Sequence, residues 1–219
     1  MDATAAHLGL PIKTGKPLAT ISGLGRAGAN LTIAAMFFVS AIPAVANYKS
    51  GIANDVWIVG AAIMGILSLV RLPPRSATIS IGAVAATAGM LVLPCLMRPA
   101  DRSNGILALC GIAIELIGVV LTQVARIYMG RRFGLLPANR GIVSKGPFAL
   151  VRHPIYIGWL LLAAGYAMSY PSARNILLIV AVLPFMIWRI EQEELLLGED
   201  PEYSAYRARV RFRLIPGLI

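Results

Sequence analysis

Residues 105–128 read GILALCGIAIELIGVVLTQVARIY, an apolar stretch in which Glu115 is the only charged residue before Arg126. A helix needs roughly 20 residues to cross the hydrocarbon core of a bilayer. A stretch of this length and composition is therefore predicted to be a membrane-spanning helix.

Five further apolar stretches are present, at residues 26–47, 55–70, 77–97, 155–170 and 174–188. The last two are short for separate spans and are divided by Ser-Tyr-Pro-Ser, so we expect a tight helical hairpin that tilts or crosses partway. The predicted fold class is all-α, a multi-pass transmembrane helical bundle. We expect about six spanning helices, with five as the alternative.

The composition agrees with a membrane protein. Hydrophobic residues make up 58% of the chain and charged residues 14%, and the mean hydropathy of +0.74 is too high for an ordinary soluble domain. The net charge of +10 does not indicate nucleic acid, because no basic face with interleaved aromatic residues is present. We expect an N-terminal cytoplasmic segment, 1–25, and a single membrane domain, 26–219.

The basic residues predict the orientation. All 20 Lys and Arg residues except Lys49, Arg98, Arg102 and Arg174 fall on one side of a six-span arrangement. Because cytoplasmic loops carry the excess of Lys and Arg, both termini are predicted to be cytoplasmic. The expected location is a bacterial inner membrane, with membrane lipids as surroundings.

Glycines in these stretches predict close helix packing. Gly111 with Gly118, and Gly158 with Gly165, lie two turns apart on one helix face. Glu115 is either a residue of a functional site or a packing residue that hydrogen bonds to a neighbouring helix.

Polar residues that indicate chemistry begin beyond residue 130. An Arg152-His153-Pro154 triplet stands directly before an apolar stretch, where Pro154 suits the first turn of a helix. Alone, the triplet is equally explained as an interfacial anchor. Arg189 and Glu193 follow the last apolar stretch and share a helix face, and with Glu194 they supply both signs of charge.

Residues 130–219 resemble the isoprenylcysteine carboxyl methyltransferase family of integral membrane enzymes, which is related to the phospholipid methyltransferases. The resemblance rests on five motifs in a fixed order: Gly146-Pro147-Phe148; Arg152-His153-Pro154-x-Tyr156-x-Gly158; Arg189 with Glu193-Glu194; Tyr203-x-x-Tyr206; and Arg213-Leu214-Ile215-Pro216-Gly217. Many family members have Phe-Gly before the paired tyrosines, where this chain has residues 199–202 on a shorter spacer. An ungapped comparison would move the carboxylate pair to Glu191 and Gln192.

The resemblance implies S-adenosylmethionine as cofactor, S-adenosylhomocysteine as product and a cytoplasmic cofactor pocket formed by the C-terminal half. It places Arg152 and Glu194 nearest the reacting centre as catalytic residues. No metal site is expected. The implied cofactor-binding residues are Lys145, Gly146, Pro147, His153, Tyr156, Gly158, Arg189, Glu193, Tyr203 and Tyr206.

Methyl transfer from a sulfonium requires mainly alignment of donor and acceptor and exclusion of water. A carboxylate acceptor, such as that of an isoprenylcysteine, needs no general base. A thiol or amine would need one, and His153 or a glutamate is available. The predicted partner is a lipophilic or small-molecule methyl acceptor. The alternatives are an NADPH-dependent membrane reductase of sterol-reductase type and a non-enzymatic membrane transporter that uses Glu115.

Overall fold

The computed structural model describes residues 23–46, 52–77, 81–97, 103–134 and 136–217. Most of the predicted N-terminal segment 1–25 lies outside these residues. The described chain is mostly helical, as predicted. Its elements are α1 (Gly23–Ala46), α2 (Ile52–Leu69), β1 (Ser76–Ala77), α3 (Ile81–Cys95), α4 (Gly105–Met129), η2 (Gly130–Arg132), β2 (Ala138–Asn139), η3 (Gly146–Ala149), α5 (Pro154–Ser169), α6 (Ala173–Leu197) and α7 (Pro201–Arg209).

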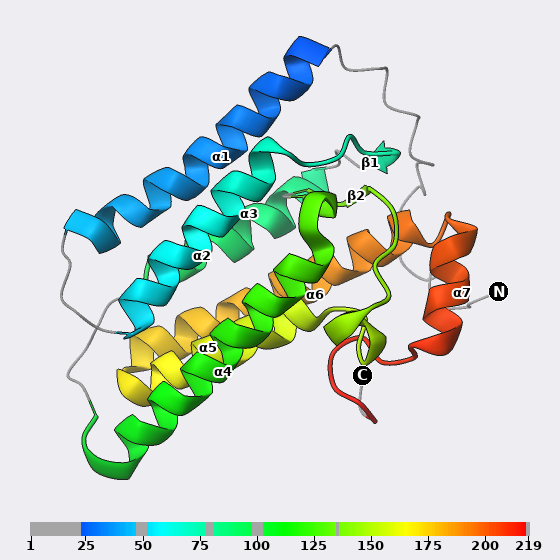
Figure 1. Ribbon diagram of the computed structural model, residues 1–219. Coiled ribbons are helices and arrows are strands. Elements are labelled where there is room, and N and C mark those ends of the chain that lie inside the picture. The colour runs from blue at the N-terminus through cyan, green and yellow to red at the C-terminus, as the bar shows by residue number, and fades with distance from the viewer. Residues whose placement is uncertain (1–22, 47–51, 78–80, 98–102, 135, 218–219) are drawn as a thin grey trace.

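The six long helices of the described chain pack as three pairs, α1 with α2, α3 with α6, and α4 with α5 (Figure 1). Each of the six predicted apolar stretches corresponds to one of these helices. The short helix α7 lies at one end of the bundle, beside the C-terminal end of α6.

Glycines allow α4 and α5 to pack closely. A Cβ added at Gly158 would lie 2.1 Å from Thr122 Oγ1 and 2.7 Å from the carbonyl oxygen of Gly118. At the other end of the contact, a Cβ at Gly111 would lie 2.9 Å from the carbonyl oxygen of Gly165. The prediction that these glycines serve helix packing is confirmed.

In the other two helix pairs, glycines of one helix leave room for aromatic rings of its neighbour. Gly82 and Gly89 of α3 lie against Trp188 and Phe185 of α6, where a Cβ would approach the rings to 2.8 and 2.4 Å. In the same way, Gly65 of α2 lies against the Phe38 ring of α1. Small residues of this kind let membrane helices approach closely where no hydrophobic driving force operates between them.

The prediction that the last two apolar stretches form a tight helical hairpin is wrong, because the two helices do not pack mainly on each other. The connection is short, since α5 ends at Ser169 and the Ser172 hydroxyl caps α6 by accepting from the Asn175 N–H. However, α5 packs mainly on α4 and α6 mainly on α3, because the glycine faces direct each helix to a different neighbour.

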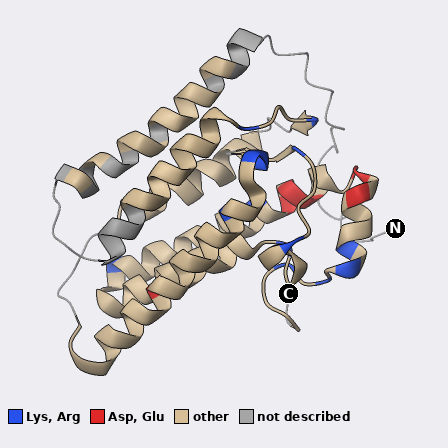
Figure 2. Cartoon of the chain, viewed as in Figure 1, with Lys and Arg blue, Asp and Glu red and all other residues tan. Residues whose placement is uncertain are grey.

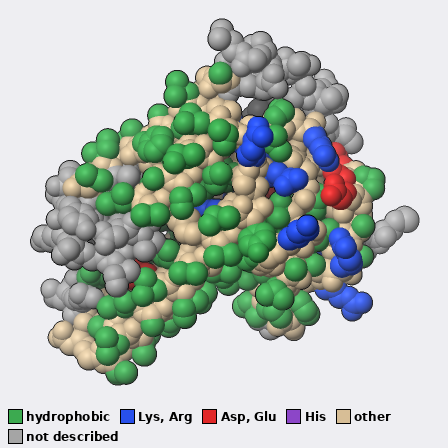
Figure 3. Space-filling view, in the orientation of Figure 1, with side chains coloured by type: hydrophobic (Ala, Val, Ile, Leu, Met, Phe, Trp, Pro, Cys, Tyr) green, Lys and Arg blue, Asp and Glu red, His purple; other side chains and the backbone are tan. Residues whose placement is uncertain are grey.

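Among the described residues, two helices, at Gly105–Arg132 and Ala173–Leu197, are long and apolar enough to cross a membrane, and only 28% and 22% of their most apolar windows are buried inside the protein. Large apolar side chains such as Ile117 and Leu177 are instead exposed. Figure 3 shows hydrophobic side chains over much of the visible surface. An exposed apolar surface of this extent identifies an integral membrane protein. The number of spans stays a prediction.

One departure from an all-α fold is a two-residue antiparallel ribbon. Ser76 pairs with Asn139 and Ala77 with Ala138. The ribbon joins the connection after α2 to the connection between α4 and α5. It therefore fixes the loop that leads to the Arg152-His153-Pro154 triplet.

Candidate active site

Most of the charged residues that Figure 2 colours lie at the end of the bundle where α7 lies. The Arg152-His153-Pro154 triplet stands at the start of α5, with His153 as N-cap and Pro154 at the first position of the helix. The predicted apolar stretch ended at residue 188, but α6 continues to Leu197 and brings Arg189, Glu193 and Glu194 to the same end.

Glu194 lies at the centre of this cluster. Its Oε1 accepts from Arg152 Nε at 2.8 Å and lies 3.2 Å from His153 Nε2. Its Oε2 accepts from Arg213, with Nε at 2.9 Å and Nη2 at 2.8 Å. Only 4% of the Glu194 side chain is exposed, so its negative charge is stabilised by these cationic donors in place of water.

Arg152 also fixes the C-terminal segment. Its Nη1 donates to the carbonyl oxygens of Val210 and Arg211, at 2.9 and 2.6 Å. The backbone N–H groups of Arg152 and His153 donate to the carbonyls of Phe212 and Arg213, both at 2.9 Å. The start of α5 thereby holds the segment that carries Arg213 against Glu194.

Tyr156, Arg189 and Glu193 form a second group beside the first. The Tyr156 hydroxyl donates to Glu193 Oε1 at 2.8 Å and accepts from Arg189 Nε at 2.7 Å. Arg189 Nε also lies 3.1 Å from Glu193 Oε1. Arg189 Nη1 donates to the Thr87 hydroxyl on α3, a contact that sequence reasoning missed. The sequence signal for this contact was the position of a polar residue, Thr87, inside the apolar stretch 77–97.

His153 lies between the two glutamates. Its Nε2 faces Glu194, and its Nδ1 lies 3.8 Å from Glu193 Oε2. The Glu193 side chain is 22% exposed, compared with 4% for Glu194. Glu193 Oε2 thus has no closer partner than this imidazole within the described part of the chain, so it has capacity left to accept a hydrogen bond from a ligand.

The paired tyrosines of α7 are both buried, with ring centroids 5.8 Å apart. The Tyr206 hydroxyl donates to the Phe148 carbonyl at 2.7 Å, which ties α7 to η3. Burial raises the pKa of Tyr206 to about 12. Burial, and after it the charge of Glu194, raises the pKa of Tyr203 further. The Tyr203 hydroxyl is buried close to the Glu194 carboxylate, but it forms no hydrogen bond of ordinary geometry among the described residues.

Four predicted cofactor residues lie outside this cluster. Gly146 has a φ of +61°, and a Cβ there would lie 2.6 Å from the Tyr128 ring of α4. Gly146 starts η3 and Pro147 follows it, while Lys145, the N-cap of η3, is exposed. Gly158 faces Thr122 of α4. A role for these four in cofactor binding stays a prediction.

The contacts favour the alignment in which Glu193 and Glu194 form the carboxylate pair over the one that uses Glu191 and Gln192. Glu191 is exposed, whereas Glu193 and Glu194 contact the arginines and His153. Glu115 lies on the α4 face that contacts Gly165 of α5, away from this cluster.

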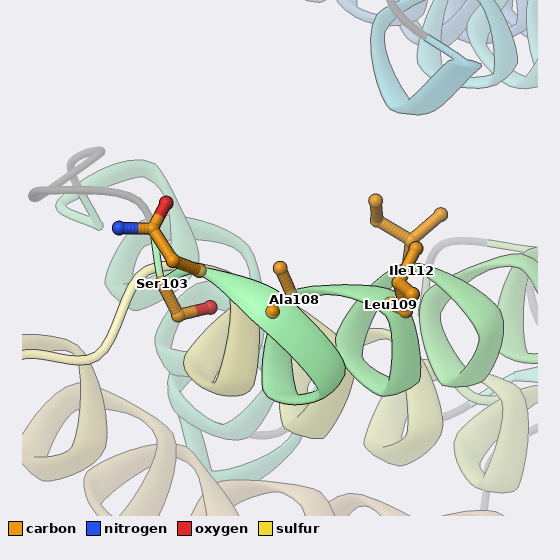
Figure 4. Close-up of a pocket in the computed structure, with 6 residues that line it drawn as sticks. Ser103, Ala108, Leu109 and Ile112 are labelled. Atoms are coloured by element: carbon orange, nitrogen blue, oxygen red, sulfur yellow. The ribbon is translucent and has the colours of Figure 1, made fainter.

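A separate groove lies at the N-terminal end of α4, at the other end of that helix from Arg126 (Figure 4). Among the residues that the structure describes, no Asp, Glu, Lys, Arg or His lines it. Its lining residues are Ser103, Asn104, Gly105, Ala108, Leu109 and Ile112.

Comparisons with known proteins agree with the chemistry of the motifs. Residues 104–199 match the phospholipid methyltransferase family model, which confirms the predicted resemblance and indicates a membrane methyltransferase. No curated protein matches the chain. One solved structure, of the eukaryotic intramembrane Ras methyltransferase ICMT (isoprenylcysteine carboxyl methyltransferase) without a monobody, is similar with 20% identity and a TM-score of 0.48, covering 89% of this chain and 76% of that chain.

Proposed function

We propose that this membrane methyltransferase takes its methyl group from S-adenosylmethionine, bound at the cytoplasmic end of α5 and α6, and transfers it to a lipophilic acceptor. The observation that carries the proposal is the pair of adjacent glutamates on α6 that surround His153, each held by an arginine. The orientation with this end in the cytoplasm, in a bacterial inner membrane, is part of the proposal.

The groups present fit the donor. S-adenosylmethionine carries an ammonium, a carboxylate and a sulfonium, so its site requires both signs of charge. Glu193 Oε2 has the capacity to accept from the ammonium, and His153 or Arg189 suits the carboxylate. The buried Tyr203 hydroxyl is a further polar atom that a ligand would satisfy.

S-adenosylmethionine supplies an activated methyl group, so the protein contributes orientation and exclusion of water. We assign positioning roles to Arg152 and Glu194, because protein partners already occupy both side chains. Arg152 and Glu194 hold the start of α5, the end of α6 and the C-terminal segment together. That assignment replaces the expectation that these two residues lie nearest the reacting centre.

The acceptor is proposed to reach the site from the bilayer. Ile187, Trp188 and Leu195 of α6 are 52%, 39% and 60% exposed, on the stretch of helix that carries the two glutamates. A lipophilic substrate that contacts these side chains reaches the cluster without leaving the membrane. The description of the matched family favours a phospholipid acceptor. If the accepting atom is an amine nitrogen, its deprotonation would require His153 or Glu193 as base.

Calorimetric titration of the detergent-purified protein with S-adenosylhomocysteine, and separately with NADPH, tests the donor. We expect saturable binding of S-adenosylhomocysteine that weakens at least about tenfold in Glu193→Gln, because a charge-assisted hydrogen bond contributes about 1.5–3 kcal/mol. The matched control is Glu191→Gln, two positions away on α6 and exposed. Binding of NADPH alone would identify a reductase, and binding of neither ligand by folded protein would exclude both enzymes.

A further inference from the structure

A polar side chain of α3 reaches the charged end of the bundle. Thr87 lies ahead of every motif on which the family resemblance rests, and it is only 4% exposed. Its hydroxyl donates to the Ala83 carbonyl at 2.7 Å and accepts from Arg189 Nη1. A hydroxyl has one proton, so the bond to Ala83 leaves an oxygen lone pair for the guanidinium. Thr87 therefore acts on the site as an acceptor for Arg189.

Arg189 is held at two of its nitrogens. While Nη1 donates to Thr87, Nε donates to the Tyr156 hydroxyl at 2.7 Å and lies 3.1 Å from Glu193 Oε1. A guanidinium is planar and its donors form a rigid fork, so contacts at two nitrogens fix the position of the whole group. The Arg189 side chain is 10% exposed, so water offers little replacement for these partners. Thr87 thus contributes one of the two points that hold a buried cation.

The two oxygens of Glu193 differ in their contacts. The Tyr156 hydroxyl donates to Oε1 at 2.8 Å, and Arg189 Nε contacts the same oxygen. The other oxygen, Oε2, lies on the side of His153, 3.8 Å from Nδ1 of the imidazole. In the proposed function, Oε2 accepts from the ammonium of the methyl donor. Its availability depends on Arg189 contacting one carboxylate oxygen only.

Removal of the Thr87 hydroxyl would change this arrangement. Arg189 Nη1 would lose its acceptor on α3 in a place with little water. The carboxylate already in contact with this guanidinium is that of Glu193, one turn along α6. Arginine and carboxylate groups form bidentate pairs through two parallel N–H···O bonds. A guanidinium released from Thr87 is therefore expected to turn toward Glu193 and to engage Oε2 as well as Oε1.

We propose that Thr87 is a positioning residue for the methyl donor: its hydroxyl holds Arg189 on Oε1 of Glu193, which leaves Oε2 free for the donor's ammonium. This inference rests on the proposed function and adds to it a residue of α3 that acts through Arg189. The competing explanation is that the bond between Thr87 and Arg189 only joins α3 to α6, as polar side chains do between membrane helices. The two explanations differ in whether the effect of Thr87 requires Glu193.

Calorimetric titration of the detergent-purified full chain with S-adenosylhomocysteine tests the proposal through Thr87→Val, which has a similar shape but no hydroxyl. We expect binding to weaken about fivefold, as for the loss of one hydrogen bond. Thr87→Ser keeps the acceptor and should bind within about twofold of the parent. The matched control is Thr32→Val on α1, which should leave the affinity unchanged. The Thr32 hydroxyl is exposed and donates to the carbonyl four residues before it, as that of Thr87 does.

A double-mutant cycle with Glu193→Gln separates positioning from helix packing. If Thr87 acts through Glu193, Thr87→Val should cause no further loss of affinity in the Glu193→Gln protein. Equal fold-losses in the two backgrounds would overturn the proposal, since Thr87 would then act independently of Glu193. A loss in Thr87→Ser as large as that in Thr87→Val would also overturn it, because the hydroxyl would not be the group that matters.

Failure of the proposed function is distinguishable from failure of this inference. A folded parent that does not bind S-adenosylhomocysteine would refute both. A parent that binds, a Glu193→Gln variant that binds more weakly and a Thr87→Val variant at parent affinity would together refute the inference alone. If thermal unfolding shows that Thr87→Val does not fold, Thr87→Ala takes its place with the same expectations, because it removes the hydroxyl without adding bulk to the contact between α3 and α6.

Discussion

Arg152 donates from Nε to Oε1 of Glu194 at 2.8 Å across 42 positions of sequence, and both side chains are almost completely buried. The contact joins the residue before the N-cap of α5 to the last turns of α6. The same guanidinium holds the Val210 and Arg211 carbonyls, so one residue fixes three segments at the α7 end of the bundle. A buried charge pair with several partners is sensitive to loss of either member.

Glu194→Gln is therefore expected to destabilise the protein strongly. The substitution leaves Arg152 buried without its counter-charge, and removing one partner of a buried pair costs about 3–5 kcal/mol. The free energy of unfolding in detergent, measured by denaturant titration, checks this. The exposed neighbour Glu191→Gln is the control and should change stability by less than about 0.5 kcal/mol. Equal stability of the two variants would contradict a structural role for the pair.

Gly158→Ala should separate α4 from α5. The added Cβ would lie 2.1 Å from Thr122 Oγ1 and 2.7 Å from the Gly118 carbonyl, and backbone does not move aside easily. Overpacking of this kind costs about 1–3 kcal/mol. The thermal unfolding midpoint should fall. Gly28→Ala on α1 is the matched control, because a Cβ there meets nothing within 4 Å, and an equal effect of both substitutions would refute the close contact.

The long apolar helices were predicted well from the sequence, because a bilayer requires apolar stretches that enter it to be helical. Each apolar stretch became a helix, since backbone groups in hydrocarbon must bond within their own segment. The end of α6 was predicted too early. Apolar composition stops at residue 188, but the charged residues beyond it remain helical because they bond to one another and to α5.

The site was predicted in part. Motif spacing identified Arg152, His153, Glu193 and Glu194, and the structure brings them together. Thr87, whose hydroxyl binds Arg189, was missed because helix pairing decides which polar residue of α3 faces α6. The backbone carbonyls of residues 210–213 were missed for a simpler reason, since every residue has a carbonyl and no residue type marks those that accept from a side chain.

The two tyrosines of α7 should respond differently to loss of their hydroxyls. Tyr206→Phe removes the bond to the Phe148 carbonyl and should reduce the free energy of unfolding by about 1 kcal/mol. Tyr203→Phe removes a buried hydroxyl without a described partner and should leave the stability of the ligand-free protein equal or slightly higher. Denaturant titration of both variants beside the parent measures the difference. A larger loss from Tyr203→Phe would show that its hydroxyl has a structural partner.

Acid should loosen α7 through Asp200. Asn139 donates to Asp200 Oδ2 at 2.7 Å, and this bond, followed by that from the Glu202 N–H, lowers the pKa of Asp200. A carboxyl whose pKa is lower in the folded state contributes stability above its unfolded pKa, about 3.9. This contribution is lost as the pH falls through the lower folded value.

Unfolding midpoints should therefore decline below about pH 4 in the parent, and Asp200→Asn should remove part of that decline. Glu202→Gln is the control, because the Glu202 side chain is exposed and its 3.9 Å ion pair with Arg75 lies at the surface, so this variant should follow the parent. If Asp200→Asn declined as steeply as the parent, the acid sensitivity would arise from another carboxyl.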